Sequence, residues 1–410
     1  MVTIAPSGEA YEWRRRERAL SSVTHRERVL AALSHREADR VPLDLGSHNA
    51  SKIHRVAYRR LLAHLGWPEE PEERDEAGLQ KHYLSAGEMA RPSEALLELL
   101  DVDFRSVSLS APDEAAAVWL DGSRFVDEWG VVWARAGEGE FINKDGPFQQ
   151  LEEPGLADLE RHEWPDPDDP GRYRGMREAA LAVREQTDYA LVLDLDLGIV
   201  NKCQRVRGFC EWLEDLPLRP AFAEGLLARV LDVEAGIARR ALAEVGDLAD
   251  VVVFYDDLGF QDRCYMHPKL YRRLVKPYHA GLVGAMKGAS PAKVLLHSDG
   301  SIHELLGDLV EIGIDAINPV QTTAAGMDSR ELKREFGEHL AFWGAIDTQR
   351  VLPFGTQEDV GREVRRRVDH LGAGGGYVLA ACHNIQADVP PENVLAMFEA
   401  AKRLRPASVE

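Results

Sequence analysis

The sequence predicts an α/β fold, a (β/α)8 TIM barrel formed by a single large domain. Eight short apolar runs occur along the chain, and each of them ends in polar residues. Amphipathic helical patterns separate most of these runs, most regularly in the second half. Parallel strands buried on both faces read as continuous apolar runs, and alternation of strand and helix implies a parallel sheet. Eight such units favour a barrel over an open doubly wound sheet, and no GxGxxG motif follows the first run.

The first predicted helix lies in "THRERVLAALSHRE", where Thr24 is a plausible N-cap. Residues 24–405 are expected to form the barrel domain, between a polar arm at residues 1–23 and a tail at residues 406–410. The predicted strands are residues 41–45, 104–109, 190–197, 250–255, 292–296, 316–318, 340–346 and 377–381.

An insertion is expected at residues 112–170, after the second strand. It is rich in Pro, Asp, Glu and Trp, and "FVDEWGVVWARAGEGEFINKDGPFQQL" alternates like a β-hairpin with "GEGE" as the turn. A lid over the barrel mouth and a purely structural addition are both consistent with this pattern.

The helices of the second half carry recognisable start signals. In "SIHELLGDLVEIG", Ser301 and Glu304 have the spacing of a capping box. "TQEDVGREVRRRVDHLG" repeats the amphipathic pattern, and "DVPPENVLAMFEAAKRL" places prolines at the first helical positions, where a missing N–H costs nothing.

Composition restricts the partners of the chain. Its 410 residues include 49 Lys plus Arg against 69 Asp plus Glu, a net charge of −20, which argues against nucleic acid or an anionic membrane as the main partner. The four cysteines lack CxxC spacing, and neither a membrane-spanning run nor a signal peptide is evident. A cytoplasmic protein with reduced thiols is expected, with a homodimer as the default assembly.

Polar side chains gather at the predicted carboxyl ends of the strands, which is where barrel enzymes place their reactive groups. An Asp or His stands at six of the eight strand ends, more than loop polarity alone requires. The residues expected to contact a small-molecule substrate are Asp44, His48, Asp196, Asn201, Gln261, Asn318, Gln321, Trp343 and Asp347.

The sharpest group is His297, Asp299 and His383. The H-x-D spacing puts two donors on one side of an extended segment, and a third donor from the adjoining wall would complete a three-ligand metal site with an open position. Asp256 or Asp257 would serve as a base or orient an imidazole. In the competing interpretation no metal binds, and the two histidines contact carboxylates or carry protons as catalytic residues.

Several stretches resemble the uroporphyrinogen decarboxylase superfamily, which includes corrinoid-dependent methyltransferases and has a TIM-barrel fold. They are "RERVLAALSHREADRVPLDLG", "DDLGFQDRCYMHPKLYRRLVKPYH", "KVLLHSDGSIHELLGDLVEIGIDAINPVQ", "FWGAIDTQRVLP" and "GGGYVLAACHNIQADVPPENV". The resemblance runs from about residue 24 to residue 405.

The decarboxylases of this superfamily carry an arginine-rich loop after the first strand, which binds substrate carboxylates. The matching stretch here, "VPLDLGSHNASKIHR", has only Arg55 nearby. Their key aspartate after the second strand is also missing, because "FRSVSLSAPDE" has Ser108 and Ser110 and no Asp before Asp113. His383 alone matches the decarboxylases' C-terminal histidine.

The methyltransferase branch implies zinc held by His-x-Cys and a later Cys, which activates a thiol to accept a methyl group. His297 matches the His, whereas Asp299 and His383 replace the two cysteines, and Cys382 is expected to point to the other face. This harder ligand set also suits Mn²⁺ or Fe²⁺. The leading hypothesis is metal-dependent methyl transfer or demethylation, with a methylated corrinoid protein or a small methylated molecule. The alternatives are a metal-free decarboxylase and a non-catalytic barrel that binds a corrinoid or tetrapyrrole.

Overall fold

The computed structural model describes residues 23–68, 89–113, 117–136 and 140–405. Nearly all of the predicted N-terminal arm, the predicted tail and the first three residues of the "GEGE" turn lie outside the described residues.

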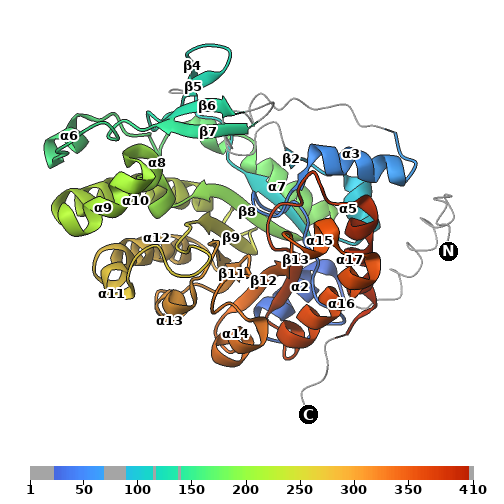
Figure 1. Ribbon diagram of the computed structural model, residues 1–410. Helices are drawn as coiled ribbons and strands as arrows, with labels where there is room; N and C mark the ends of the chain where they lie inside the picture. The colour runs from blue at the N-terminus through green and yellow to red at the C-terminus, as the bar shows by residue number, and fades with distance from the viewer. Residues whose placement is uncertain (1–22, 69–88, 114–116, 137–139, 406–410) are drawn as a thin grey trace.

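A curved, fully parallel sheet forms the centre of the fold, with helices on its outside (Figure 1). Its order within the described residues is β13-β12-β11-β10-β9-β8-β3. Seven of the eight predicted strands are therefore confirmed, with ends that differ by no more than one residue. The strands are β3 (Phe104–Ser108), β8 (Ala190–Leu197), β9 (Val251–Tyr255), β10 (Lys293–His297), β11 (Ala316–Asn318), β12 (Ala341–Ile346) and β13 (Tyr377–Ala381).

The predicted first strand, residues 41–45, is reduced to an isolated parallel bridge between Leu43 and Leu379. On one side, the Leu379 N–H donates to the Pro42 carbonyl (2.9 Å) and the Asp44 N–H donates to the Leu379 carbonyl (3.0 Å). On the other side, the Leu43 N–H donates to a carboxylate oxygen of Asp103 (2.7 Å). The Asp103 N–H also donates to the Leu43 carbonyl (2.9 Å), so the Asp103 side chain replaces one of the two backbone bonds and no continuous ladder forms. This segment still links β13 to the start of β3 and occupies the eighth position of the barrel.

The helices surround this sheet and mostly follow the predicted alternation. N-terminal to β9 they are α2 (His25–Leu33), α3 (Arg55–His64), α5 (Glu94–Leu100), α6 (Leu156–Arg161), η1 (Pro170–Tyr173), α7 (Met176–Gln186), α8 (Val200–Arg207), α9 (Phe209–Leu218) and α10 (Pro220–Val245). C-terminal to β9 they are α11 (Pro268–Leu270), η2 (Tyr271–Val275), α12 (Lys276–Ala289), η3 (His303–Leu305), α13 (Leu306–Glu311), α14 (Ser329–Phe336), α15 (Val351–Phe354), α16 (Gln357–Arg367), η4 (Val368–Gly372) and α17 (Pro391–Arg403). None of the helices in the described ranges combines the length and apolar character needed to cross a membrane.

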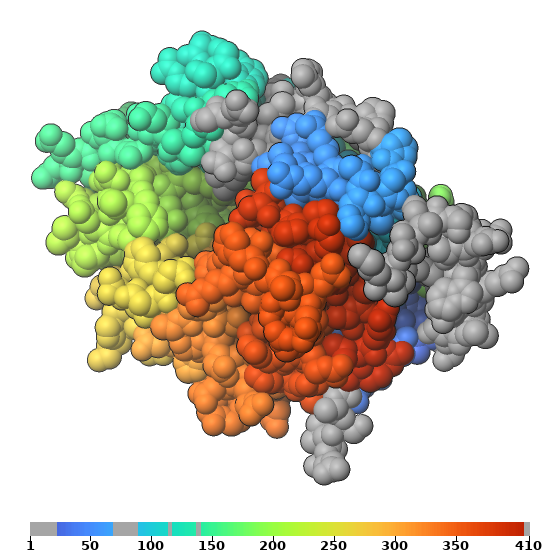
Figure 2. Space-filling model, turned by 45° about the vertical axis from the view of Figure 1, so that its right-hand side comes forward, coloured from blue at the N-terminus to red at the C-terminus, as the bar shows by residue number. Residues whose placement is uncertain are grey.

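The insertion forms an antiparallel sheet in the order β4-β5-β6-β7, which stands at the top of the molecule (Figures 1 and 2). The predicted hairpin is confirmed by the pairing of β6 (Val132–Ala136) with β7 (Glu140–Asp145). The sheet also contains β4 (Val118–Trp119) and β5 (Arg124–Val126), which are too short to show a period-two pattern in the sequence. A second antiparallel pair joins β1 (Ile53–His54) to β2 (Met89–Ala90).

The two faces of the parallel sheet pack into separate clusters. Alternate residues of the strands, among them Phe104, Val253, Leu295 and Trp343, form the barrel interior. The residues between them pack against the surrounding helices. Since successive side chains of a strand point to opposite faces, His297 lies on the same interior side as Leu295.

Two of the predicted helix starts have different outcomes. The Thr24 cap is confirmed, because its hydroxyl accepts from the Glu27 N–H in a complete capping box. The predicted capping box at Ser301 and Glu304 is wrong. The Ser301 hydroxyl donates instead to the Ala325 carbonyl (2.7 Å), a partner that sequence spacing could not reveal, and the following turn is the 3-10 helix η3.

Candidate functional site

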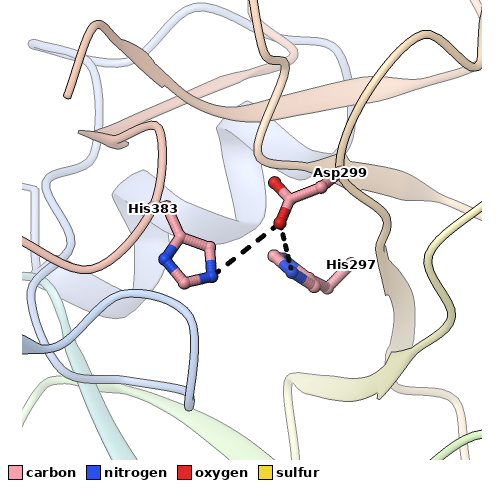
Figure 3. Close-up of side chains that lie close together, drawn as sticks. All are labelled: His297, Asp299 and His383. Atoms are coloured by element: carbon pink, nitrogen blue, oxygen red, sulfur yellow. Dashed lines mark ion pairs between the residues drawn. The ribbon is translucent and has the colours of Figure 1, made fainter. Parts of the chain in front are cut away.

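Three side chains from two strand ends converge at the mouth of the barrel (Figure 3). The Asp299 carboxylate lies between the imidazoles, with its Oδ2 3.7 Å from His297 Nε2 and 3.9 Å from His383 Nε2. One ligand atom from each residue lies within 4.8 Å of the other two. His297 ends β10, Asp299 follows it in the next loop, and His383 follows β13. The structure thus brings together the three residues that the sequence singled out; they are called the triad below.

The ring of His297 is oriented by its neighbour in the next strand. His297 and Asn318 are paired in the parallel register of β10 and β11. The His297 Nδ1–H donates to Asn318 Oδ1 at 2.6 Å. Because the proton sits on Nδ1, the lone pair of Nε2 is left facing Asp299 and His383. A histidine that binds a metal through one nitrogen commonly donates from the other in this way.

Protein atoms packed around His383 lower its pKa, an effect that Asp299 partly offsets and His297 reinforces. A lowered pKa favours the neutral imidazole, which is the form that binds a metal. The donor set of two nitrogens and a carboxylate oxygen suits zinc as well as harder divalent ions. Ligand atoms around a tetrahedral zinc lie roughly 3.3 Å apart, so the distances between the ligand atoms of the triad, at most 4.8 Å, would have to shorten by no more than about 1.5 Å around an ion. These residues therefore fit a divalent metal.

The two adjacent aspartates after β9 occupy different environments. Asp256 is fully buried and accepts hydrogen bonds from the Ile199 and Asn201 N–H groups (2.8 and 2.7 Å) and from His279 Nε2 (2.9 Å). It therefore holds the start of α8 and does not face the triad. Asp257, in contrast, faces the triad. Its Oδ1 accepts from the Asp299 N–H (3.0 Å) and lies 4.0 Å from His297 Nε2.

A cavity of about 230 Å³ adjoins the triad and shares Asp299 and His383 with it. Three residues that the sequence assigned to substrate, Gln261, Gln321 and Asp347, line this cavity. Its other lining residues are Thr322, Thr323, Thr348, Gln349 and Cys382. The threonines and Gln349 were not foreseen, although they directly follow Gln321 and Asp347 in the loops after β11 and β12.

Cys382 corrects one expectation. It was expected to point away from His383, but both residues line the cavity. The strand β13 ends at Ala381, so the alternation of side chains no longer applies to the two residues that follow. The Cys382 thiol is buried, and burial together with the charges of Asp299 and Asp347 raises its pKa well above the usual value.

Three of the predicted substrate residues lie deeper in the barrel. Trp343 is fully buried, and its Nε1–H donates to Asp44 Oδ2 at 2.9 Å. Burial raises the pKa of Asp44 to about 6. His48 Nε2 lies 3.6 Å from the same carboxylate, and burial lowers the pKa of this imidazole. Asp44, His48 and Trp343 are buried, contact one another and do not line the cavity.

Asp196 and Asn201 are separated from the triad cavity in different ways. Asp196 lies in a second cavity of about 50 Å³ beside the insertion, where it pairs with Lys202 Nζ at 3.1 Å. Asn201 lies between the two aspartates: its N–H donates to Asp256, and its Oδ1 accepts from the Asp257 N–H at 3.1 Å.

These features define an α/β-barrel protein with a candidate metal site at the carboxyl ends of its strands. The chain belongs to the uroporphyrinogen decarboxylase (URO-D) family, whose model matches residues 141–404. Uroporphyrinogen decarboxylase from Methylococcus capsulatus is 25% identical over 279 residues, which cover 65% of this chain and 75% of that protein. The match to the Neisseria gonorrhoeae enzyme is 26% identical over 182 residues, and covers 44% of this chain and 49% of the relative.

A solved structure of similar fold is the methyltransferase from Methanosarcina mazei. It aligns with a TM-score of 0.65 over 93% of this chain and 99% of its own, at 19% sequence identity. This likeness shows the shared fold and confirms the TIM-barrel-like class expected from the sequence.

Proposed function

We propose that the protein is a metal-dependent enzyme that transfers or removes a methyl group. His297, Asp299 and His383 would hold a divalent ion, zinc or a harder metal such as Mn²⁺ or Fe²⁺. The methyl donor would be a methylated corrinoid protein or a small methylated molecule.

The observation that carries this proposal is the convergence of the triad, with His297 Nε2 left available by the bond from Nδ1 to Asn318. Three protein ligands leave a position open for substrate. The name of the similarly folded Methanosarcina mazei protein, a methyltransferase, supports the same reaction class. A bound divalent ion would supply a Lewis acid that favours the deprotonated form of a coordinated thiol or water.

Other side chains would prepare the site for this chemistry. Asn318 fixes the ring of His297, and Asp257 fixes the backbone of the loop that carries Asp299. The Asp257 carboxylate, whose Oδ1 lies 4.0 Å from His297 Nε2, is close enough to the triad to accept a proton from a substrate that approaches the open position.

The curated relatives favour a second candidate, a metal-free decarboxylase, because they are named uroporphyrinogen decarboxylases. Such a substrate needs cationic partners for its carboxylates. None of the described residues that line the triad cavity is lysine or arginine. The cavity thus supports the methyl-transfer proposal better than this alternative.

The test is to measure metal content and methyl transfer in the same preparations. The full chain, purified without added metal, is expected to hold about one metal ion, measured by plasma mass spectrometry. With that ion it should transfer the methyl group of methylcobalamin to 2-mercaptoethanol, followed by the loss of methylcobalamin absorbance. His297→Ala should lose both the ion and the transfer, because only two ligands remain.

His64→Ala is the matched control, since His64 is an exposed histidine at the end of α3. It should keep the metal and the activity of the wild type. Full activity of a metal-free wild-type protein, or an unchanged metal content in His297→Ala, would exclude the proposed role of the triad. Tight cobalamin binding without turnover would favour a carrier.

A further inference from the structure

The cavity beside the triad is lined mainly by neutral polar side chains. Ten described residues surround it, and none of them is lysine or arginine. The two acidic members are Asp299 and Asp347. Six members carry an amide or a hydroxyl group: Gln261, Gln321, Thr322, Thr323, Thr348 and Gln349.

One wall of the cavity is built by a pair of glutamines. Gln321 Nε2 donates to Gln261 Oε1 at 2.9 Å, and Gln321 Oε1 accepts from the Gly300 N–H at 2.9 Å. This second bond ties the wall to the loop that carries Asp299. The Gln261 amide nitrogen has no hydrogen-bond partner among the described residues, so it is left as a donor for a ligand.

A second part of the lining, in the loops after β11 and β12, follows the same design. Thr323 Oγ1 donates to Gln349 Oε1 at 3.1 Å, and the Gln349 N–H donates to Asp347 Oδ1 at 2.7 Å. Both bonds fix this part of the lining. Among the described residues, the side-chain nitrogen of Gln349 and Asp347 Oδ2 have no hydrogen-bond partner, so they remain as a donor and an acceptor for a ligand. The cavity therefore offers fixed donors and acceptors in two parts of its lining, and none of the described lining side chains is a lysine or an arginine.

We propose that this cavity takes a small, uncharged substrate that hydrogen-bonds through amide, hydroxyl or ether groups, and that its side chains by themselves favour such a molecule over a carboxylate or phosphate. This inference rests on the proposed function, because it names the substrate class of the same site. When no ion is bound, an anion in this cavity lacks a cationic partner, which is costly, and Asp299 and Asp347 add repulsion. The volume of about 230 Å³ is below the roughly 300 Å³ at which pockets for drug-sized ligands begin, which limits the substrate to a small molecule.

The test compares two probes of the same shape and different charge, 2-methoxyacetamide and methoxyacetate. Their binding to the full chain after treatment with a chelator is measured by titration calorimetry. Removing metal prevents a carboxylate from binding through the ion alone. The amide is expected to bind at least about tenfold more tightly than the anion. Equal or tighter binding of methoxyacetate, or no binding of the amide, would overturn the inference.

Gln349→Lys places a cation in the exposed wall and should strengthen methoxyacetate binding about tenfold. Gln357→Lys, the same change at the exposed first residue of α16, should leave both affinities unchanged. If the two lysine variants behave alike, Gln349 does not face the ligand and the inference fails. Because these measurements need no metal, a chain that prefers the amide but never holds an ion would refute the metal proposal and leave this one standing.

Discussion

His297 donates from Nδ1 to Asn318 Oδ1 across the β10–β11 register, at 2.6 Å. Both residues are buried, so water does not compete for this bond. The bond selects the tautomer whose Nε2 lone pair faces Asp299 and His383, and it couples a strand pairing to the chemistry of the triad.

Replacing Asn318 should weaken metal binding without removing a ligand. We expect Asn318→Leu to lower zinc affinity by about 10- to 100-fold, because the ring loses the acceptor that fixes its tautomer and orientation. Asn318→Asp keeps an acceptor at the same place and should retain most of the affinity. Competition with a chromogenic chelator measures the zinc affinity of both variants. Equal zinc affinity in the leucine variant and the wild type would contradict this role.

The two aspartates after β9 should respond differently to the same change. Asp256→Asn is expected to destabilise the fold by about 3 kcal/mol, because a buried carboxylate that accepts from two backbone N–H groups and His279 becomes an amide. Asp257→Asn should change stability by less than about 1 kcal/mol, since its side chain is part-exposed, and should instead lower the rate of methyl transfer. Urea unfolding and initial rates separate the two effects, and a stable but inactive Asp256→Asn would reverse the assignment.

Much of the fold could be predicted from short sequence patterns such as helix caps and apolar runs. Thr24 caps its helix as predicted, and Pro391 starts α17 at a position where a missing N–H costs nothing. The grouping of His297, Asp299 and His383 could also be predicted, because the carboxyl ends of parallel strands meet at one edge of a barrel.

Features that depend on distant partners could not be read from spacing. The Ser301 hydroxyl bonds to Ala325, and Cys382 turns into the cavity once its strand has ended. Asp256 and Asp257 look equivalent in sequence, and only their different partners in the fold, such as His279 from α12 for Asp256 and the Asp299 N–H for Asp257, distinguish them. The same holds for Asp103, whose side chain has partners from two separate segments, α2 and residues 40–43.

Asp103 is expected to be a major determinant of stability. It is fully buried and accepts from Arg28 Nη1 (2.6 Å), Arg40 Nη1 (2.7 Å) and the Leu43 N–H (2.7 Å), so it holds the segment that completes the barrel. Asp103→Ala should cost about 3–5 kcal/mol, because two buried guanidinium groups each lose the fully buried one of their two carboxylate partners. Asp262→Ala, which removes an exposed partner of Arg263, should cost less than about 0.5 kcal/mol. Similar unfolding midpoints in urea for these two variants would contradict this role.

Glu234 lies on α10 beside the second cavity and is buried. Its Oε2 accepts from the Gly198 N–H at 3.0 Å. Burial raises its pKa from 4.5 to about 8, an effect that the charge of Lys202 partly offsets. The folded protein therefore keeps this carboxyl protonated at pH values at which the unfolded chain has lost the proton.

The pH dependence of stability should show this difference. Between the unfolded and folded pKa values the folded state binds more protons, so the free energy of unfolding falls as pH rises, by up to about 1.4 kcal/mol per pH unit. Glu234→Gln cannot titrate and should lose this slope, so its stability relative to the wild type improves from about pH 5 to about pH 8. Glu224→Gln, an exposed change on the same helix, should retain the wild-type slope. Urea unfolding at several pH values measures all three proteins, and parallel curves for wild type and Glu234→Gln would show that Glu234 ionises normally in the folded state.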